Sequence, residues 1–321
     1  ILLGKFPIMM QSNFCILKGL SRDVRFTMGE CRNDPGGYFI IDGKEKSIVC
    51  QEKFADNMLY IRDKVNDLYT HSAEIRSVSE DASKPIRTVS VRIVASTPTK
   101  KNEQIVVNVP NVRKPVPLFI VMRALGIISD HEIVRYCLLD LKKNDHLVDN
   151  LVPSVYDAGE IFTQETALKY MATLTKGKTV SHVMEVLMNY FLPHVSITNL
   201  QQKAFFLGYI VFRLLRVYNK DEPATDRDNF KYKRVELTGN LLHSLFTEYY
   251  KLQERNIFLG IDKEYYYKKG VYQKNFISLI QNNYQEFFKE RIIETGFKKA
   301  FKGNWGAETH TKRAGIVQDL N

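Results

Sequence analysis

The segment 297–321 carries the side chains best suited to chemistry with an anionic partner. Five cations outnumber two carboxylates there, which gives a net charge of +3. The cations flank Phe297, Phe301 and Trp305, and such a mixture suits neutralisation of a phosphate backbone with occasional stacking on bases. Composition alone fits equally well with aromatic side chains in a core and lysines in water. The cations are Lys298, Lys299, Lys302, Lys312 and Arg313.

A second candidate is the D-x-D pair Asp226 and Asp228, which offers two carboxylates to a divalent metal ion. One hypothesis is therefore a small enzyme that uses both aspartates with Mg²⁺. The alternative is a turn with Asx hydrogen bonds and an ion pair to Arg227 or Lys233, and we favour it because aspartate readily caps turns. We expect no catalytic residue and no metal site in this chain.

Other catalytic and metal-binding patterns are missing from the sequence. It contains neither the G-x-x-x-x-G-K-[ST] phosphate loop nor the G-x-S-x-G nucleophile motif. Its four cysteines never form C-x-x-C, and no two histidines have zinc-finger spacing. We expect free thiols in a reducing compartment.

The bulk properties describe an ordinary folded protein with a basic surface. The chain has 321 residues, 44% hydrophobic and 26% charged, which predicts about two domains. A net charge of +10 favours an anionic partner through electrostatic steering. No apolar run reaches the roughly 18 residues that span a bilayer, so we expect no membrane partner. The chain begins at Ile1 without a methionine, and we expect it to be a piece of something longer.

A β-hairpin is predicted over residues 34–51. Asp34-Pro35-Gly36-Gly37 has the composition of a turn, and Asp42-Gly43 is typical of a type I′ hairpin loop. The predicted strands are Tyr38–Ile41 and Ser47–Cys50. Lys44, Glu45 and Lys46 then fall at the hairpin tip or just beyond it, so the hairpin presents a cation on a rigid element.

The rest of the chain predicts a hairpin-rich first part and a helical second half, an α+β fold. Residues 51–62 have the spacing of a short amphipathic helix. Two alternating strands follow, Ile86–Val94 and Gln104–Val109, with a basic tip at Lys100 and Lys101. Caps and apolar periodicity then predict helices over 118–125, 130–141, 163–174, 180–191, 199–218, 237–253 and 276–291.

The hairpin segment resembles the "DPGGYFIINGSEKV…Q" segment of the second-largest subunit of multisubunit DNA-directed RNA polymerases, in its eukaryotic or large-DNA-virus form. Further matches follow in constant order along nearly the whole chain. They pair Gly4–Met10 with "GKVPIML", Gly29–Cys31 with "GEC", Arg123–Asp130 with "RALGIVSD", Leu192–His194 with "LPH", Lys203–Tyr209 with "KAFFLGY", 226–239 with "DRDHFGNKRLDLAG", 295–306 with "SGLKYALATGNWG" and 312–321 with "SRAGVSQVLN". Lys231 replaces the glycine that follows the aromatic residue of "DRDHFGNKRLDLAG", and the segment after Phe301 is one residue shorter than its counterpart.

The resemblance implies which cations face the nucleic acid. The lysine of "GSEK" and the first lysine of "GLKYA" face the RNA–DNA hybrid in the family, and they match Lys46 and Lys298. The arginine and glutamine of "SRAGVSQ", at the start of the family's fork beside the hybrid, match Arg313 and Gln318. It assigns no contact to Lys299, Lys302 or Lys312.

The resemblance also implies an architecture. A discontinuous protrusion domain would comprise residues 1–61 and 236–303, a lobe domain would be inserted at 62–235, and the fork would begin at 304. The implied work is non-catalytic: one wall of the cleft for template DNA and the hybrid, with Mg²⁺ held by the largest subunit and no cofactor here.

The implied partners are the largest polymerase subunit, small subunits including a zinc-ribbon subunit, and initiation factors at the lobe. The implied location is the nucleus, or a cytoplasmic virus factory or virion if the gene is viral. A free-standing basic nucleic-acid-binding module remains the alternative.

Overall fold

The computed structural model describes residues 3–81, 84–98, 103–267, 269–272, 275–288 and 291–320. It mixes helices and strands, which confirms the predicted α+β class. The chain divides into two compact units. An inserted unit comprises Phe54–Lys233, and an outer unit combines Ile1–Lys53 with Arg234–Asn321. No helix in the described part of the chain is long and apolar enough to span a membrane.

The inserted unit is built on a five-stranded antiparallel sheet. Its strands follow one another in chain order: β4 (Leu59–Asp63), β5 (Tyr69–Ser77), β6 (Arg87–Val94), β7 (Ile105–Asn108) and β8 (Val116–Pro117). The predicted strands at 86–94 and 104–109 are confirmed as β6 and β7. The predicted tip at Lys100 and Lys101 lies outside the described residues. Side chains of β6 such as Val91 and Ile93 are buried, because alternate positions of a strand share one face.

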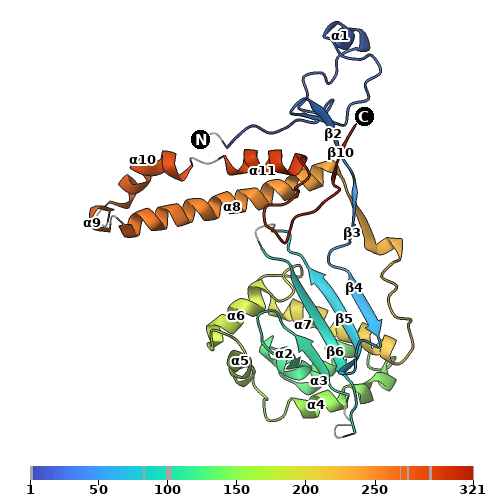
Figure 1. The fold of residues 1–321 in the computed structure, drawn as a ribbon. Helices are drawn as coiled ribbons and strands as arrows, with labels where there is room; N and C mark the ends of the chain where they lie inside the picture. The colour runs from blue at the N-terminus through green and yellow to red at the C-terminus, as the bar shows by residue number, and fades with distance from the viewer. Residues whose placement is uncertain are drawn as a thin grey trace. The chain divides into compact units, whose positions relative to one another are not determined.

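Helices gather against one face of this sheet (Figure 1). The longest, α7 (Leu200–Tyr218), contacts β4, β5 and β6, as its apolar sequence predicts. Asn199 caps it by accepting a hydrogen bond from the backbone N–H of Gln202, and Thr163 caps α5 in the same way. The other helices of this unit are α2 (Leu118–Ala124), α3 (Asp130–Leu138), η1 (Asp145–Asn150), α4 (Val152–Asp157), α5 (Gln164–Thr173), α6 (Val180–Asn189) and η2 (Phe230–Tyr232).

The helix predicted over residues 51–62 is wrong. The segment forms β3 (Gln51–Phe54) and then β4, whose Ile61 lies opposite Ala73 of β5. The backbone N–H of Thr225 also donates to the carbonyl of Ile61, at 2.8 Å. A strand partner thus outweighs the local helical spacing. The chain enters the inserted unit at 53/54 and leaves it at 233/234.

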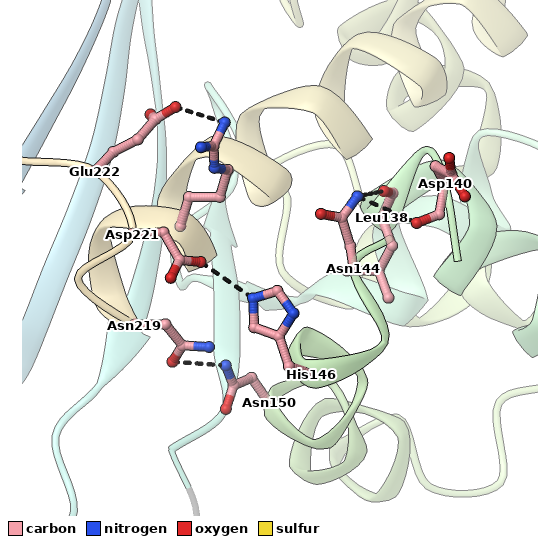
Figure 2. A network of polar contacts seen from close by, with 9 residues as sticks. Leu138, Asp140, Asn144, His146, Asn150, Asn219, Asp221 and Glu222 are labelled. Carbon is pink, nitrogen blue, oxygen red and sulfur yellow. Dashed lines mark hydrogen bonds and ion pairs between the residues drawn. The ribbon is translucent and has the colours of Figure 1, made fainter. Parts of the chain in front are cut away.

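A polar network fastens η1 to the end of α7 within the inserted unit (Figure 2). His146 Nε2 lies 3.2 Å from Asp221 Oδ2, and Asn150 Nδ2 donates to Asn219 Oδ1 at 3.0 Å. Glu222 forms ion pairs with two arginines: its Oε2 lies 3.0 Å from Arg213 Nε, and its Oε1 lies 2.6 Å from Arg216 Nη1. These contacts tie η1 and the residues after α7 to the C-terminal end of α7.

The outer unit packs a small sheet against helices. The sheet order is β1 (Phe39–Ile41), β2 (Lys44–Ile48) and β10 (Val317–Asp319), all antiparallel. The helices are α1 (Arg22–Thr27), α8 (Thr238–Tyr267), α9 (Lys269–Tyr272), α10 (Phe276–Phe287) and α11 (Ile292–Phe301). Both α10 and α11 run along α8 (Figure 1). β9 (Lys233–Glu236) pairs with β3 where the chain passes between the units.

One apolar cluster joins the sheet and helices of the outer unit. The ring of Phe39 lies 4.8 Å from that of Phe301, and the ring of Trp305 lies 6.0 Å from that of Phe301. Leu241 and Leu245 of α8 complete the cluster. The predicted helix over 237–253 extends to Tyr267, because α10 packs along its second half. The aromatic residues at 297, 301 and 305 are therefore buried rather than free for base stacking.

Candidate nucleic-acid interface

The predicted hairpin is confirmed, with a type I′ loop at its tip. Asp42 and Gly43 both have positive φ, at 51° and 77°. The returning strand starts earlier than predicted, at Lys44, so Lys46 lies in the middle of β2 and not at the tip. Its position in the strand, opposite Phe39, puts both side chains on the same face of the sheet.

The turn before the hairpin is held by the N-terminal segment. Asp34 accepts hydrogen bonds from the backbone N–H of Gly36 at 2.8 Å and from the Tyr38 hydroxyl at 2.6 Å. The latter bond raises the pKa of Tyr38. Gly36 has a φ of 71°, and a Cβ atom there would lie 2.8 Å from the carbonyl oxygen of Met10. Only glycine at this position lets the 34–37 turn approach the backbone of the N-terminal segment at Met10 so closely.

Lys46 is paired within the sheet. Its Nζ atom lies 2.5 Å from Oδ1 of Asp319, the residue opposite it in β10. Its side chain is only 12% exposed, against 48% for Asp319. The hydrogen bond from Lys46 lowers the pKa of Asp319. A phosphate contact by Lys46 thus requires the ammonium to share or leave this carboxylate.

Lys298 lies on α11 and is more accessible, with a side chain 61% exposed. Its Nζ atom is 3.2 Å from Oε1 of Glu294, one helical turn earlier. Glu294 Oε2 also accepts a hydrogen bond from the backbone N–H of Lys5 at 3.2 Å. The Lys298 and Lys5 hydrogen bonds lower the pKa of Glu294, which stays ionised and holds Lys298 in place.

Lys302 joins the helix to the hairpin. Its Nζ atom lies 2.8 Å from Oδ2 of Asp42 at the hairpin tip. The Lys302 hydrogen bond and charge, followed by the charges of Lys298 and Lys46, lower the pKa of Asp42. Lys46 and Lys298, which the motifs predicted and which are far apart in sequence, therefore both lower the pKa of Asp42. Lys302, to which the sequence assigned no role, acts on the same carboxylate. Its pairing with Asp42 could not be predicted from the residues around either position.

Arg313 and Gln318 are placed differently. Arg313 forms an antiparallel bridge with Trp305, and its Nη1 atom lies 3.5 Å from Oε2 of Glu236. Gln318 lies opposite Ser47 in β10, one residue from Asp319. Because neighbouring positions of a strand point to opposite faces, its side chain lies on the other face from Lys46. Of the four predicted residues, Lys46 and Lys298 thus act electrostatically on the same carboxylate, that of Asp42.

The D-x-D pair forms a turn. Asp226 Oδ1 accepts a hydrogen bond from the backbone N–H of Asp228 at 3.0 Å, the Asx bond that the sequence favoured. Arg227 lies over the rings of Phe54 and Tyr60 at 5.2 and 5.3 Å. Among the described residues, no group of three or more histidine, cysteine or acidic side chains has a metal-binding arrangement.

Comparison with known proteins decides the family. A family model described as RNA polymerase beta subunit matches residues 1–283. The chain belongs to the RNA polymerase beta-subunit family. This confirms the resemblance to multisubunit DNA-directed RNA polymerases found in the sequence motifs.

Individual relatives of this beta-family chain are polymerase subunits. DNA-directed RNA polymerase II subunit RPB2 of Encephalitozoon cuniculi is 35% identical over 99% of this chain and 27% of its own length. DNA-directed RNA polymerase II subunit 2 of Arabidopsis thaliana is 32% identical over 100% and 27%. DNA-directed RNA polymerase subunit Rpo2 of Saccharolobus shibatae is 29% identical over 81% and 23%. The chain therefore spans about a quarter of the length of these relatives.

Proposed function

We propose that this chain is part of the second-largest subunit of a DNA-directed RNA polymerase and forms one wall of the cleft that holds template DNA and the RNA–DNA hybrid. Its work is non-catalytic. The nucleotidyl transfer belongs to the assembled enzyme, with Mg²⁺ on the largest subunit. The single observation that carries the proposal is the Lys302–Asp42 ion pair, together with the electrostatic effect of Lys298 and Lys46 on the same carboxylate, in a protein of this family.

Two of the three lysines are open to a phosphate-bearing partner. Lys298 and Lys302 have side chains 61% and 60% exposed, so their ammonium groups reach solvent. Their carboxylate partners Glu294 and Asp42 hold them in fixed positions but are displaceable by phosphate oxygens. Such contacts neutralise backbone charge without reading sequence, which a processive polymerase requires.

The two units are proposed to be the protrusion and the lobe. The outer unit up to residue 303 would be the protrusion, the inserted unit the lobe, and residues from 304 the start of the fork. The proposed partners are the largest subunit and small subunits, with initiation factors and a zinc-ribbon subunit at the lobe.

The identities of the relatives support the eukaryotic form of the enzyme. RNA polymerase II subunits match at 32–35% identity over essentially the whole chain, whereas Rpo2 matches at 29% over 81%. We propose a nuclear location on this ground; a virus factory or virion applies only if the gene is viral. Because the relatives are polymerase subunits, the free-standing nucleic-acid-binding module is not favoured.

The test is the salt dependence of elongation-complex stability in the assembled enzyme. Lys298→Ala and Lys46→Ala should each weaken the complex and reduce the slope of log affinity against log salt by about one, the value for one lost phosphate contact. Arg313→Ala and Gln318→Ala test the two residues predicted from the motifs. Lys263→Ala on α8, the same loss of charge away from Asp42, is the control. An unchanged slope in Lys298→Ala would reject the interface.

The enzyme hypothesis has its own test. If Asp226 and Asp228 served a metal, the isolated chain with Mg²⁺ would transfer or hydrolyse nucleotides, and Asp226→Asn with Asp228→Asn would abolish that activity. We expect no aspartate-dependent activity, because the Asx hydrogen bond already engages Asp226.

A further inference from the structure

A second group of cations surrounds a hollow in the outer unit. The hollow has a volume of about 620 Å³ and lies between α8, α11 and the loop that follows α11. This volume lies within the range of about 300–1,000 Å³ typical of small-molecule sites. Three cationic residues line it: Arg291, Lys299 and Lys312.

The three cations come from separate segments. Arg291 precedes α11, Lys299 lies on the helix, and Lys312 lies on the loop beyond Trp305. Arg291 Nη1 is 3.4 Å from Glu294 Oε2. Within the described part of the chain, Lys299 and Lys312 make no ion pair, and no carboxylate lines the hollow. Two unneutralised ammonium groups thus share one concavity, an arrangement that favours an anion.

Part of the lining of the hollow is apolar and comes from Tyr249, Leu252 and Ile292. The Tyr249 hydroxyl donates to the carbonyl of Gly306 at 3.0 Å, which ties the loop to α8. A Cβ atom at Gly296 would lie 2.4 Å from the Tyr249 ring, so helix and ring are in close contact. A lining that combines apolar and cationic side chains matches a ligand that joins a phosphate to a flat, weakly polar group.

We propose that this hollow binds a nucleotide phosphate, with the phosphate at Lys299 and Lys312 beside Arg291 and the base or sugar over Tyr249 and Ile292. The site goes beyond the proposed interface, because it uses none of the lysines around Asp42. It also differs from the motifs of the resemblance: Lys299 stands where "GLKYA" has tyrosine, and Lys312 where "SRAGVSQ" has serine. The hollow is therefore a property of this chain rather than of the motif.

The experiment is a binding titration of the 321-residue chain with AMP, followed by calorimetry or by NMR. Lys299→Gln and Lys312→Gln should each raise the dissociation constant roughly tenfold, because each removes one charge-assisted hydrogen bond. Lys263→Gln, the same change on an exposed part of α8, should leave it unchanged. Near-UV circular dichroism of each variant establishes that the unit is folded.

Two further comparisons separate the sources of the phosphate and separate this site from the Asp42 group. If AMP binds and adenosine does not, the site accepts the phosphate of a free nucleotide. If a 5′-phosphorylated oligothymidylate binds more weakly to the two variants while a 5′-hydroxyl oligothymidylate does not, the site accepts the phosphate at a nucleic-acid end. Either result supports the site. Lys298→Ala should leave AMP binding intact even if it weakens elongation complexes. The proposal is overturned if neither phosphate ligand binds, or if binding is the same in the folded Lys299→Gln/Lys312→Gln variant.

Discussion

The Nζ atom of Lys302 lies 2.8 Å from Oδ2 of Asp42, and this ion pair fastens the end of α11 to the tip of the β1–β2 hairpin. Both side chains are well exposed, so the pair contributes little to stability, and its main effect is to fix positions. Around it, Asp319 holds Lys46 and Glu294 holds Lys298. Each lysine of the proposed interface is thus placed by one carboxylate.

Lys302→Gln should raise the pKa of Asp42 toward its ordinary value of 3.8, because Lys302 is the main cause of the lowered pKa. With a folded pKa below the unfolded one, the pair stabilises the fold fully above the unfolded value, and the contribution is lost as pH falls through the folded pKa. Carboxyl ¹³C titration by NMR measures the shift. Lys263→Gln is the matched control; an unmoved Asp42 titration in Lys302→Gln would contradict the pairing.

Lys203→Met should destabilise the inserted unit by about 3 kcal/mol, the cost of leaving buried acceptors unpaired. The buried ammonium donates to the carbonyls of Leu187, Met188 and Phe191 at 2.6, 2.7 and 2.6 Å, and so closes the end of α6. Burial lowers its pKa to about 8, which leaves it charged at neutral pH. Urea denaturation gives the difference, with the exposed Lys142→Met as control. A loss no larger than that of the control would show that the bonds are dispensable.

Gly296→Ala and Gly239→Ala should change stability in opposite directions. A Cβ at Gly296 would meet the Tyr249 ring at 2.4 Å, so α11 and α8 must separate, at a cost of about 1–3 kcal/mol. At Gly239, also helical, a Cβ meets nothing within 4 Å, and alanine should stabilise α8 by up to about 1 kcal/mol. Thermal unfolding of both variants tests the pair. Equal shifts would argue against the close packing of α11 on α8.

Glu248→Ala should loosen the loop after Trp305 without unfolding the outer unit. Glu248 Oε2 accepts hydrogen bonds from the backbone N–H of Ala307 at 3.0 Å and from Thr311 Oγ1 at 3.3 Å. Without them the Ala307 amide has no acceptor from α8, so its hydrogen exchange should accelerate while that of core amides stays slow. Hydrogen exchange by NMR resolves the two, and Glu254→Ala on the same helix is the control. Unchanged exchange at Ala307 would show that the Glu248 hydrogen bonds do not restrain the loop.

The turns and the helix caps could be predicted from the sequence. Glycines and aspartates predicted the turn at 34–37 and the hairpin loop at Asp42-Gly43, and cap residues such as Thr163 and Asn199 predicted helix starts. These features depend on residues a few positions apart, whose conformational preferences act without the rest of the chain. The sequence motifs alone likewise indicated the polymerase family.

Only the tertiary structure decided which distant residues become neighbours. The helical spacing of residues 51–62 gave way to strands because β4 finds a partner in β5. Lys46 meets Asp319, 273 positions away, and Gln318 turns to the opposite face, because β10 pairs with β2 in that one register. Strand register and helix packing depend on the whole core, and no local pattern encodes them. The sequence therefore determined most elements and the family, while the fold determined which carboxylate each lysine pairs with.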